Sequence, residues 1–180
     1  MIRAFLAILM LATLAGCSVL KGPTEPVPPL AWLSPADGPH PALLKQKLTL
    51  SAHGQQKEMI AITRLTASAV TMAGLTPTGQ TLVQIRYDAN GFASTPAASP
   101  QLPSDAILSL LQWALWPEHA LYDAYPANSG WAVMIDKGSR NLSYQGQAIL
   151  RMRQIDAERI EIDHLSAGYT VRIEPLESSQ

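Results

Sequence analysis

The sequence predicts an α+β fold in which a strongly curved antiparallel sheet holds a helical hairpin in its concave face. Stretches that alternate apolar and polar residues occur both before and after one helical region, and nearly all connections between them are short. Short connections favour antiparallel pairing. The helical region is strongly apolar, so laying it against the sheet buries both surfaces.

The N-terminus is typical of an exported, lipid-modified protein. Arg3 precedes an apolar run from Ala4 to Ala15, which is shorter than the ~20 residues needed to cross a bilayer. The sequence Leu14-Ala15-Gly16-Cys17 resembles the lipobox of bacterial lipoproteins, in which the cysteine thiol receives diacylglycerol. Cys17 is the only cysteine, so it has no disulfide partner. This favours lipidation over an ordinary secretory signal or a buried N-terminal helix.

Two or more acyl chains would make Cys17 a stable membrane anchor. Ser18 stands where enterobacteria-like sorting uses Asp to retain a lipoprotein in the inner membrane, so the resemblance implies the periplasmic face of the outer membrane. We predict a signal peptide at 1–16, a lipidated proline-rich tether at 17–42 and a single domain at 43–180. Three apolar residues in the tether are expected to dock on the domain: Leu30, Trp32 and Leu33.

The charge balance argues against nucleic acid as a partner. The chain has 13 Lys+Arg and 14 Asp+Glu, and loss of Arg3 with the signal brings the net charge from −1 to about −2, with no basic block.

The first half of the domain reads as strands at hairpin spacing, predicted at 47–52, 57–65, 68–75 and 81–88. In the last of these, Val83, Ile85 and Tyr87 face one way, whereas Arg86 and Asp88 face the other. Asn90-Gly91 then predicts a hairpin, because both residues tolerate positive φ. For Arg86, an ion pair with Asp88 or a neighbouring strand is favoured over an anion site.

A helix is predicted from Ser104, as N-cap, to about Leu115, where Pro117 ends it. A short second helix is predicted at 117–123, with proline at its first position.

The chain then returns to strands, predicted at 131–136, 141–144, 147–154, 159–165 and 168–174. A three-residue loop at 156–158 places Arg153 opposite Glu161 and Arg151 opposite Asp163, and a two-residue loop at 166–167 places Glu161 opposite Arg172. This charge ladder is expected on the outside of the sheet. The inner face would then carry Ala148, Leu150, Met152, Ile160, Ile162, Tyr169, Val171 and Ile173.

Enzymatic templates are absent from the sequence. It contains no nucleophile elbow, P-loop or dinucleotide fingerprint. The four histidines (His40, His53, His119 and His164) lack metal-ligand spacing. We therefore predict a protein that is not an enzyme and has no cofactor or metal.

The apolar helix carries the one functional hypothesis. Trp113 and Trp116 either fill the core or border a cavity for an acyl chain or other long apolar ligand, and both hold if the helix plugs an empty cavity. The predicted cavity residues are Trp113, Trp116, Leu111, Leu115 and Tyr87.

Three segments carry a family resemblance: Gln80–Asp88, Asp105–Pro117 and Gly168–Ile173. With the lipobox, they resemble an uncharacterised family of outer-membrane lipoproteins, domain of unknown function 3261, often encoded beside aryl polyene biosynthesis genes. The family is distantly similar to the lipoprotein carriers LolA and LolB, which implies an unclosed barrel with a hydrophobic cavity covered by helices. The implied function is binding or transfer of a lipid-like ligand by a monomer, with an envelope protein as a further partner. The alternative is a non-catalytic scaffold that recruits pathway proteins.

Overall fold

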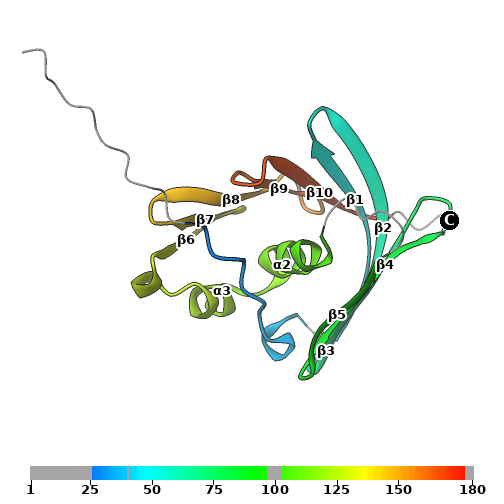
Figure 1. Cartoon of the computed structure of the whole chain (residues 1–180), viewed down its shortest axis with the longest axis horizontal. Coiled ribbons are helices and arrows are strands. Elements are labelled where there is room, and N and C mark those ends of the chain that lie inside the picture. The colour runs from blue at the N-terminus through cyan, green and yellow to red at the C-terminus, as the bar shows by residue number, and fades with distance from the viewer. Residues whose placement is uncertain (1–25, 40, 97–102, 177–180) are drawn as a thin grey trace, which may run out of the picture.

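The computed structural model describes residues 26–39, 41–96 and 103–176, which form one ten-stranded antiparallel sheet and two α-helices (Figure 1). The strand order is β5-β4-β3-β2-β1-β10-β9-β8-β7-β6. The two edge strands, β5 and β6, do not pair with each other, so the sheet stays open. Figure 1 shows it bending around α2. The predicted antiparallel sheet with helices is confirmed.

The chain order alternates two sets of strands with one helical region. The first set is β1 (Ala42–Ala52), β2 (Gln55–Thr66), β3 (Ala69–Leu75), β4 (Thr81–Asp88) and β5 (Gly91–Pro96). The helices are η2 (Pro35–Asp37), α2 (Ser104–Leu115), α3 (Glu118–Ala124) and η3 (Ala127–Ser129). The second set is β6 (Trp131–Asp136), β7 (Ser139–Tyr144), β8 (Gln147–Gln154), β9 (Ile160–His164) and β10 (Tyr169–Pro175). Each predicted strand has its counterpart, although β1 begins five residues earlier than expected.

The predicted hairpin after β4 is confirmed, with Asp88 paired to Gly91. Of Asn90 and Gly91, only Gly91 adopts positive φ, at 98°, which glycine tolerates because it has no Cβ. The backbone N–H of Asn90 instead donates to the Asp88 carboxylate at 2.8 Å. That carboxylate also accepts from Arg86 at 2.6 Å, so the predicted ion pair of Arg86 is confirmed.

The first helix ends at Leu115 as predicted, whereas the starts of both helices differ from the prediction by one position. Pro103, not Ser104, occupies the N-cap of α2, and no side chain caps it. Pro117 likewise precedes the first residue of α3. At the other end of α2, the Arg140 guanidinium donates to the carbonyls of Trp113 (2.7 Å) and Trp116 (2.8 Å). A cation from β7 thus satisfies helix carbonyls that lack intrahelical partners.

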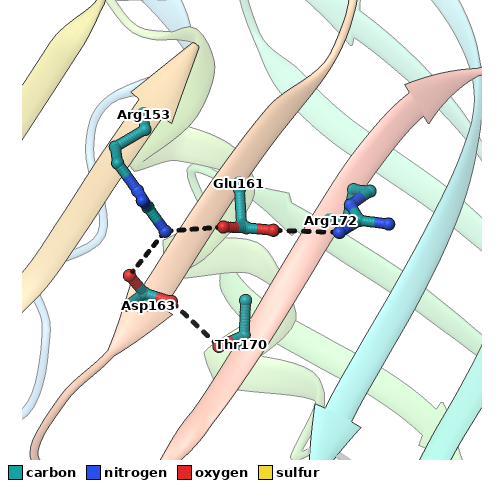
Figure 2. A network of polar contacts seen from close by, with 5 residues as sticks. All are labelled: Arg153, Glu161, Asp163, Thr170 and Arg172. Atoms are coloured by element: carbon teal, nitrogen blue, oxygen red, sulfur yellow. Dashed lines mark hydrogen bonds and ion pairs between the residues drawn. The ribbon is translucent and has the colours of Figure 1, made fainter. Parts of the chain in front are cut away.

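The predicted register of β8, β9 and β10 is confirmed by the strand pairs Arg153–Glu161, Arg151–Asp163 and Glu161–Arg172. Figure 2 shows the resulting network: Glu161 accepts from Arg153 at 2.6 Å and from Arg172 at 3.1 Å. The Asp163 carboxylate contacts Arg153 diagonally at 3.4 Å rather than its direct neighbour Arg151, and it accepts from the Thr170 hydroxyl at 2.9 Å. Residues 165–168 form the turn, longer than the predicted two-residue loop without a change of register.

The inner face follows the prediction except at Ala148, which is exposed. A β-bulge is the cause: Leu142 pairs with Leu150, whereas Ser143 pairs with Ala148, which leaves Ile149 as an extra residue. The bulge inverts the alternation, so Ile149 and Leu150 are both buried.

The core lies between the concave face of the sheet and α2, and it includes part of the segment before β1. Residues 30–34 of that segment, which we call the strap, run past α2 and α3 towards η2 (Figure 1). Leu33 is buried, and the Trp32 ring stacks on Phe92 with centroids 4.8 Å apart. The predicted docking of these two residues is therefore confirmed, and Leu30 is half-buried against the core.

Candidate functional site: a cavity between helix and sheet

An apolar cavity of about 110 Å³ lies between α2 and the strands β1, β2, β3, β4 and β10. Eleven of the thirteen lining residues are aliphatic: Leu48, Leu50, Met59, Met72, Leu82, Val83, Ile107, Leu110, Leu111, Val171 and Ile173. The other two are Lys57 and Glu58. Such a wall excludes charge and accepts hydrocarbon.

The lining residues are brought together by the periodicity of helix α2 and by the alternation of side chains along the strands. In α2, Ile107, Leu110 and Leu111 lie three and four residues apart, so they share one face of the helix. In the sheet, register aligns the inner-face residues across strands: Met59 and Ile173 both pair with Leu48. Alternate residues of neighbouring strands therefore meet one helix face.

The mouth of the cavity lies at Lys57 and Glu58, the two lining residues that are exposed. Lys57 pairs with Leu50, which lines the cavity, so both side chains stand on the inner face. Glu58 stands on the outer face, where its carboxylate lies 3.8 Å from the Lys47 ammonium.

Two flexible methionines, Met59 and Met72, form part of the wall. Gly74 makes room for one of them: a Cβ at this position would clash with the Met59 sulfur and lie 2.7 Å from Val83 Cγ1. Because methionine has an unbranched, adaptable side chain, this part of the wall can change shape at low cost.

The five sequence-predicted residues are not gathered at one site. Leu111 lines the cavity, whereas Trp113 lies on another side of α2, with its ring edge-on to Tyr125 at 5.9 Å. From Tyr125 the row of aromatic rings continues to Trp131 in β6 and to Tyr144 in β7, at one edge of the sheet. Trp113 is buried, and within the described residues its indole N–H has no acceptor.

Trp116 and Tyr87 contact the N-terminal segment instead. The Trp116 indole N–H donates to the Ser34 carbonyl at 2.9 Å, and its ring lies so close to Gly38 that a Cβ there would be 2.7 Å away. The Tyr87 ring lies 5.6 Å from that of Trp32. Leu115 is half-buried against the core. A ligand-binding role for these residues stays a prediction.

The strap is fastened to the helices by polar side chains that the sequence interpretation did not single out. Gln112 is fully buried and exchanges hydrogen bonds with the backbone of Leu33. The Tyr125 hydroxyl accepts from the Ala31 N–H at 3.1 Å, and burial raises the pKa of Tyr125 to about 12. The sequence did contain a signal for the role of Gln112. A glutamine on an otherwise apolar helix face is expected to be buried, and a buried amide needs hydrogen-bond partners.

Other chemistry is limited in the part of the chain that is described. No group of three or more His, Cys, Asp or Glu side chains there is placed to hold a metal ion. Burial lowers the pKa of His164, whose ring lies 4.9 Å from that of Tyr169. None of the described helices is long and apolar enough to cross a membrane. Cys17 and the predicted signal peptide lie outside the described residues.

Comparison with protein-family models gives a match over most of the chain. The family model described as "Protein of unknown function (DUF3261)" matches residues 43–177. The match covers both α-helices and, apart from Ala42, all ten strands. In a sequence comparison, no curated protein matches the chain.

Proposed function

The chain belongs to the DUF3261 family, and from its geometry we propose that it binds the apolar chain of a lipid-like molecule in the cavity between α2 and the sheet. The observation that carries this proposal is the composition of the cavity wall, aliphatic at every lining position except Lys57 and Glu58. An apolar cavity whose exposed lining residues are charged suits an unbranched chain, which buries its length and leaves its head in water.

The volume defines how binding would proceed. About 110 Å³ is less than the roughly 300–1,000 Å³ typical of ligand pockets. A long chain must therefore enlarge the cavity, and Met59 and Met72 are the wall residues best suited to yield. In this account α2 packs against the wall when the site is empty, which fits the buried state of Leu110 and Leu111.

Membrane attachment is part of the same proposal. Lipidation of Cys17 would hold the domain at the periplasmic face of the outer membrane, next to a source or acceptor of apolar cargo. The cargo would be an aryl polyene lipid, as the neighbouring genes of the family imply, or the acyl chains of lipoproteins, by analogy with LolA and LolB. Radiolabelled palmitate should label the wild-type protein and not Cys17→Ser, and equal labelling would remove the anchor from the proposal.

Native mass spectrometry tests ligand binding directly. The protein is exported in its own host as residues 17–180 with Cys17→Ser, which retains every residue that the structure describes. A co-purifying hydrophobic mass supports the proposal and identifies the cargo. A clean apo mass, together with no uptake of a fluorescent fatty acid, contradicts it.

A cavity-filling variant locates the site. Val171→Phe places a larger side chain in the cavity and should reduce uptake of the fluorescent fatty acid at least tenfold, with little change in melting temperature. Val133→Phe, in β6 and outside the lining, is the matched control. Undiminished uptake by Val171→Phe would show that the cavity is not the site.

A non-catalytic scaffold is the second candidate. Met134 on the edge strand β6 is 68% exposed, and an edge strand with an apolar side chain can recruit another protein. Met134→Lys should abolish pathway-protein recruitment in pull-down from the host if the scaffold reading is right, and leave lipid uptake unchanged if the binding proposal is right.

A further inference from the structure

The mouth of the cavity carries a charge asymmetry that bears on the class of ligand. Lys57 and Glu58 are neighbours in β2, but their side chains stand on opposite faces of the sheet. The Glu58 carboxylate is directed to the outer face, where Lys47 lies 3.8 Å from it and 3.0 Å from Glu174. The inner side of the mouth is therefore left with the cation.

Lys57 has no ion-pair partner among the described residues. It differs in this from Lys47, whose ammonium lies between two carboxylates on the outer face. Its aliphatic stem lines the apolar cavity, and its exposed ammonium reaches water. A hydrocarbon wall topped by one unpaired cation complements a molecule with an apolar tail and an anionic head.

We propose that the cavity selects amphiphiles with an anionic headgroup, a carboxylate or a phosphate, and that Lys57 is the residue that pairs with that group. This inference rests on the proposed function, since it requires a tail in the cavity. Lysine is a compact, mobile point charge that binds either anion without requiring the planar geometry of arginine. An exposed ion pair contributes little energy, so Lys57 sets the headgroup preference while the tail supplies most of the affinity.

The test uses residues 17–180 with Cys17→Ser and displacement of Nile red, a neutral apolar dye. Dodecanoate, dodecyl phosphate, 1-dodecanol and dodecylamine share one tail and differ only in the head. We expect both anions to bind about two- to fivefold more tightly than the alcohol, which is the range of an exposed ion pair, and the amine to bind least. The preference should shrink as salt rises.

Lys57→Met keeps the apolar stem and removes the charge, so it should abolish the difference between the anions and the alcohol without weakening binding of the alcohol. Lys57→Glu should reverse the order in favour of the amine. Lys137→Met, in the turn after β6, is the control and should retain the wild-type preference.

The outcomes separate the two proposals. If no amphiphile displaces the dye, the proposed function itself fails. If all four bind with equal affinity, or if Lys57→Met keeps the anion preference, ligand binding stands and the headgroup role of Lys57 is overturned. A preference for only one of the two anions identifies which headgroup the site accepts.

Discussion

Gln112 and Leu33 exchange two hydrogen bonds across 79 positions of sequence. The side-chain amide of Gln112 donates to the Leu33 carbonyl at 2.7 Å, and its oxygen accepts from the Leu33 N–H at 2.9 Å. The glutamine thus pairs with an extended backbone as a neighbouring strand would. It joins the segment nearest the membrane anchor predicted at Cys17 to the helix that covers the cavity.

Replacement of Gln112 by leucine should destabilise the domain by about 2–4 kcal/mol, because it leaves the buried N–H and C=O of Leu33 without partners. Guanidinium denaturation measures the loss, and limited proteolysis should show faster cleavage in the strap. Gln84→Leu, on the exposed face of β4, is the control and should change stability by less than about 0.5 kcal/mol. Equal effects of the two variants would contradict the role of Gln112.

The two buried tryptophans at the C-terminal end of α2, Trp113 and the C-cap residue Trp116, should respond differently to replacement by phenylalanine. Both substitutions remove similar volume, but Trp116→Phe also leaves the Ser34 carbonyl without its donor, whereas Trp113→Phe removes an N–H that has no acceptor within the described residues. Trp116→Phe should therefore cost about 1 kcal/mol more than Trp113→Phe in thermal unfolding. The opposite order would mean that packing outweighs the hydrogen bond.

Arg140→Met should cost about 1–3 kcal/mol, since it retains an apolar stem and leaves the carbonyls of Trp113 and Trp116 unpaired. Burial lowers the pKa of Arg140, which indicates a partly desolvated cation whose removal also relieves some cost. Arg151→Met, exposed on β8, serves as the control. Chemical denaturation measures the free energy of unfolding of both variants. A loss of stability in Arg140→Met no greater than that in Arg151→Met would rule out capping of α2 by Arg140.

Acid should weaken the turn between β8 and β9. The Arg159 side chain and the backbone N–H groups of Glu158 and Arg159 hold the pKa of Asp156 at about 2, below its usual value of 3.8. Because the folded pKa is the lower one, this stabilisation is present above about pH 4 and is lost as pH falls through 2.

Asp156→Asn should therefore have a lower melting temperature than wild type at pH 5, and the difference should close towards pH 2. Asp136→Asn, at the end of β6, provides the comparison at each pH. A difference for Asp156→Asn that is constant with pH would indicate that the carboxylate charge contributes nothing.

The sheet could be predicted in detail because its signals are local. Alternation located each strand, and the charges of Arg153, Glu161 and Arg172 identified the register. The bulge at Ile149 was not predictable in this way, because one extra residue in a strand changes no local preference.

The candidate site was harder to predict from the sequence than the sheet was. The cavity depends on which face of α2 meets the sheet. The two largest side chains at the end of this helix turn elsewhere: Trp113 contacts the aromatic row, and the C-cap residue Trp116 contacts the strap. Of the predicted residues only Leu111 lines the cavity. Lys57 was not singled out, because the role we propose for it depends on Glu58 facing the other way.

The strand order also bears on how the chain reaches its native state. Every strand pair except β1–β10 joins strands that are consecutive in the sequence, so β1–β5 and β6–β10 are two meanders of low contact order. Each meander can form by pairing of consecutive strands, and only the β1–β10 pair requires closure of a long loop. We therefore expect the two halves to join late and slowly, so that a substitution in that pair, such as Leu48→Ala opposite Ile173, should slow refolding.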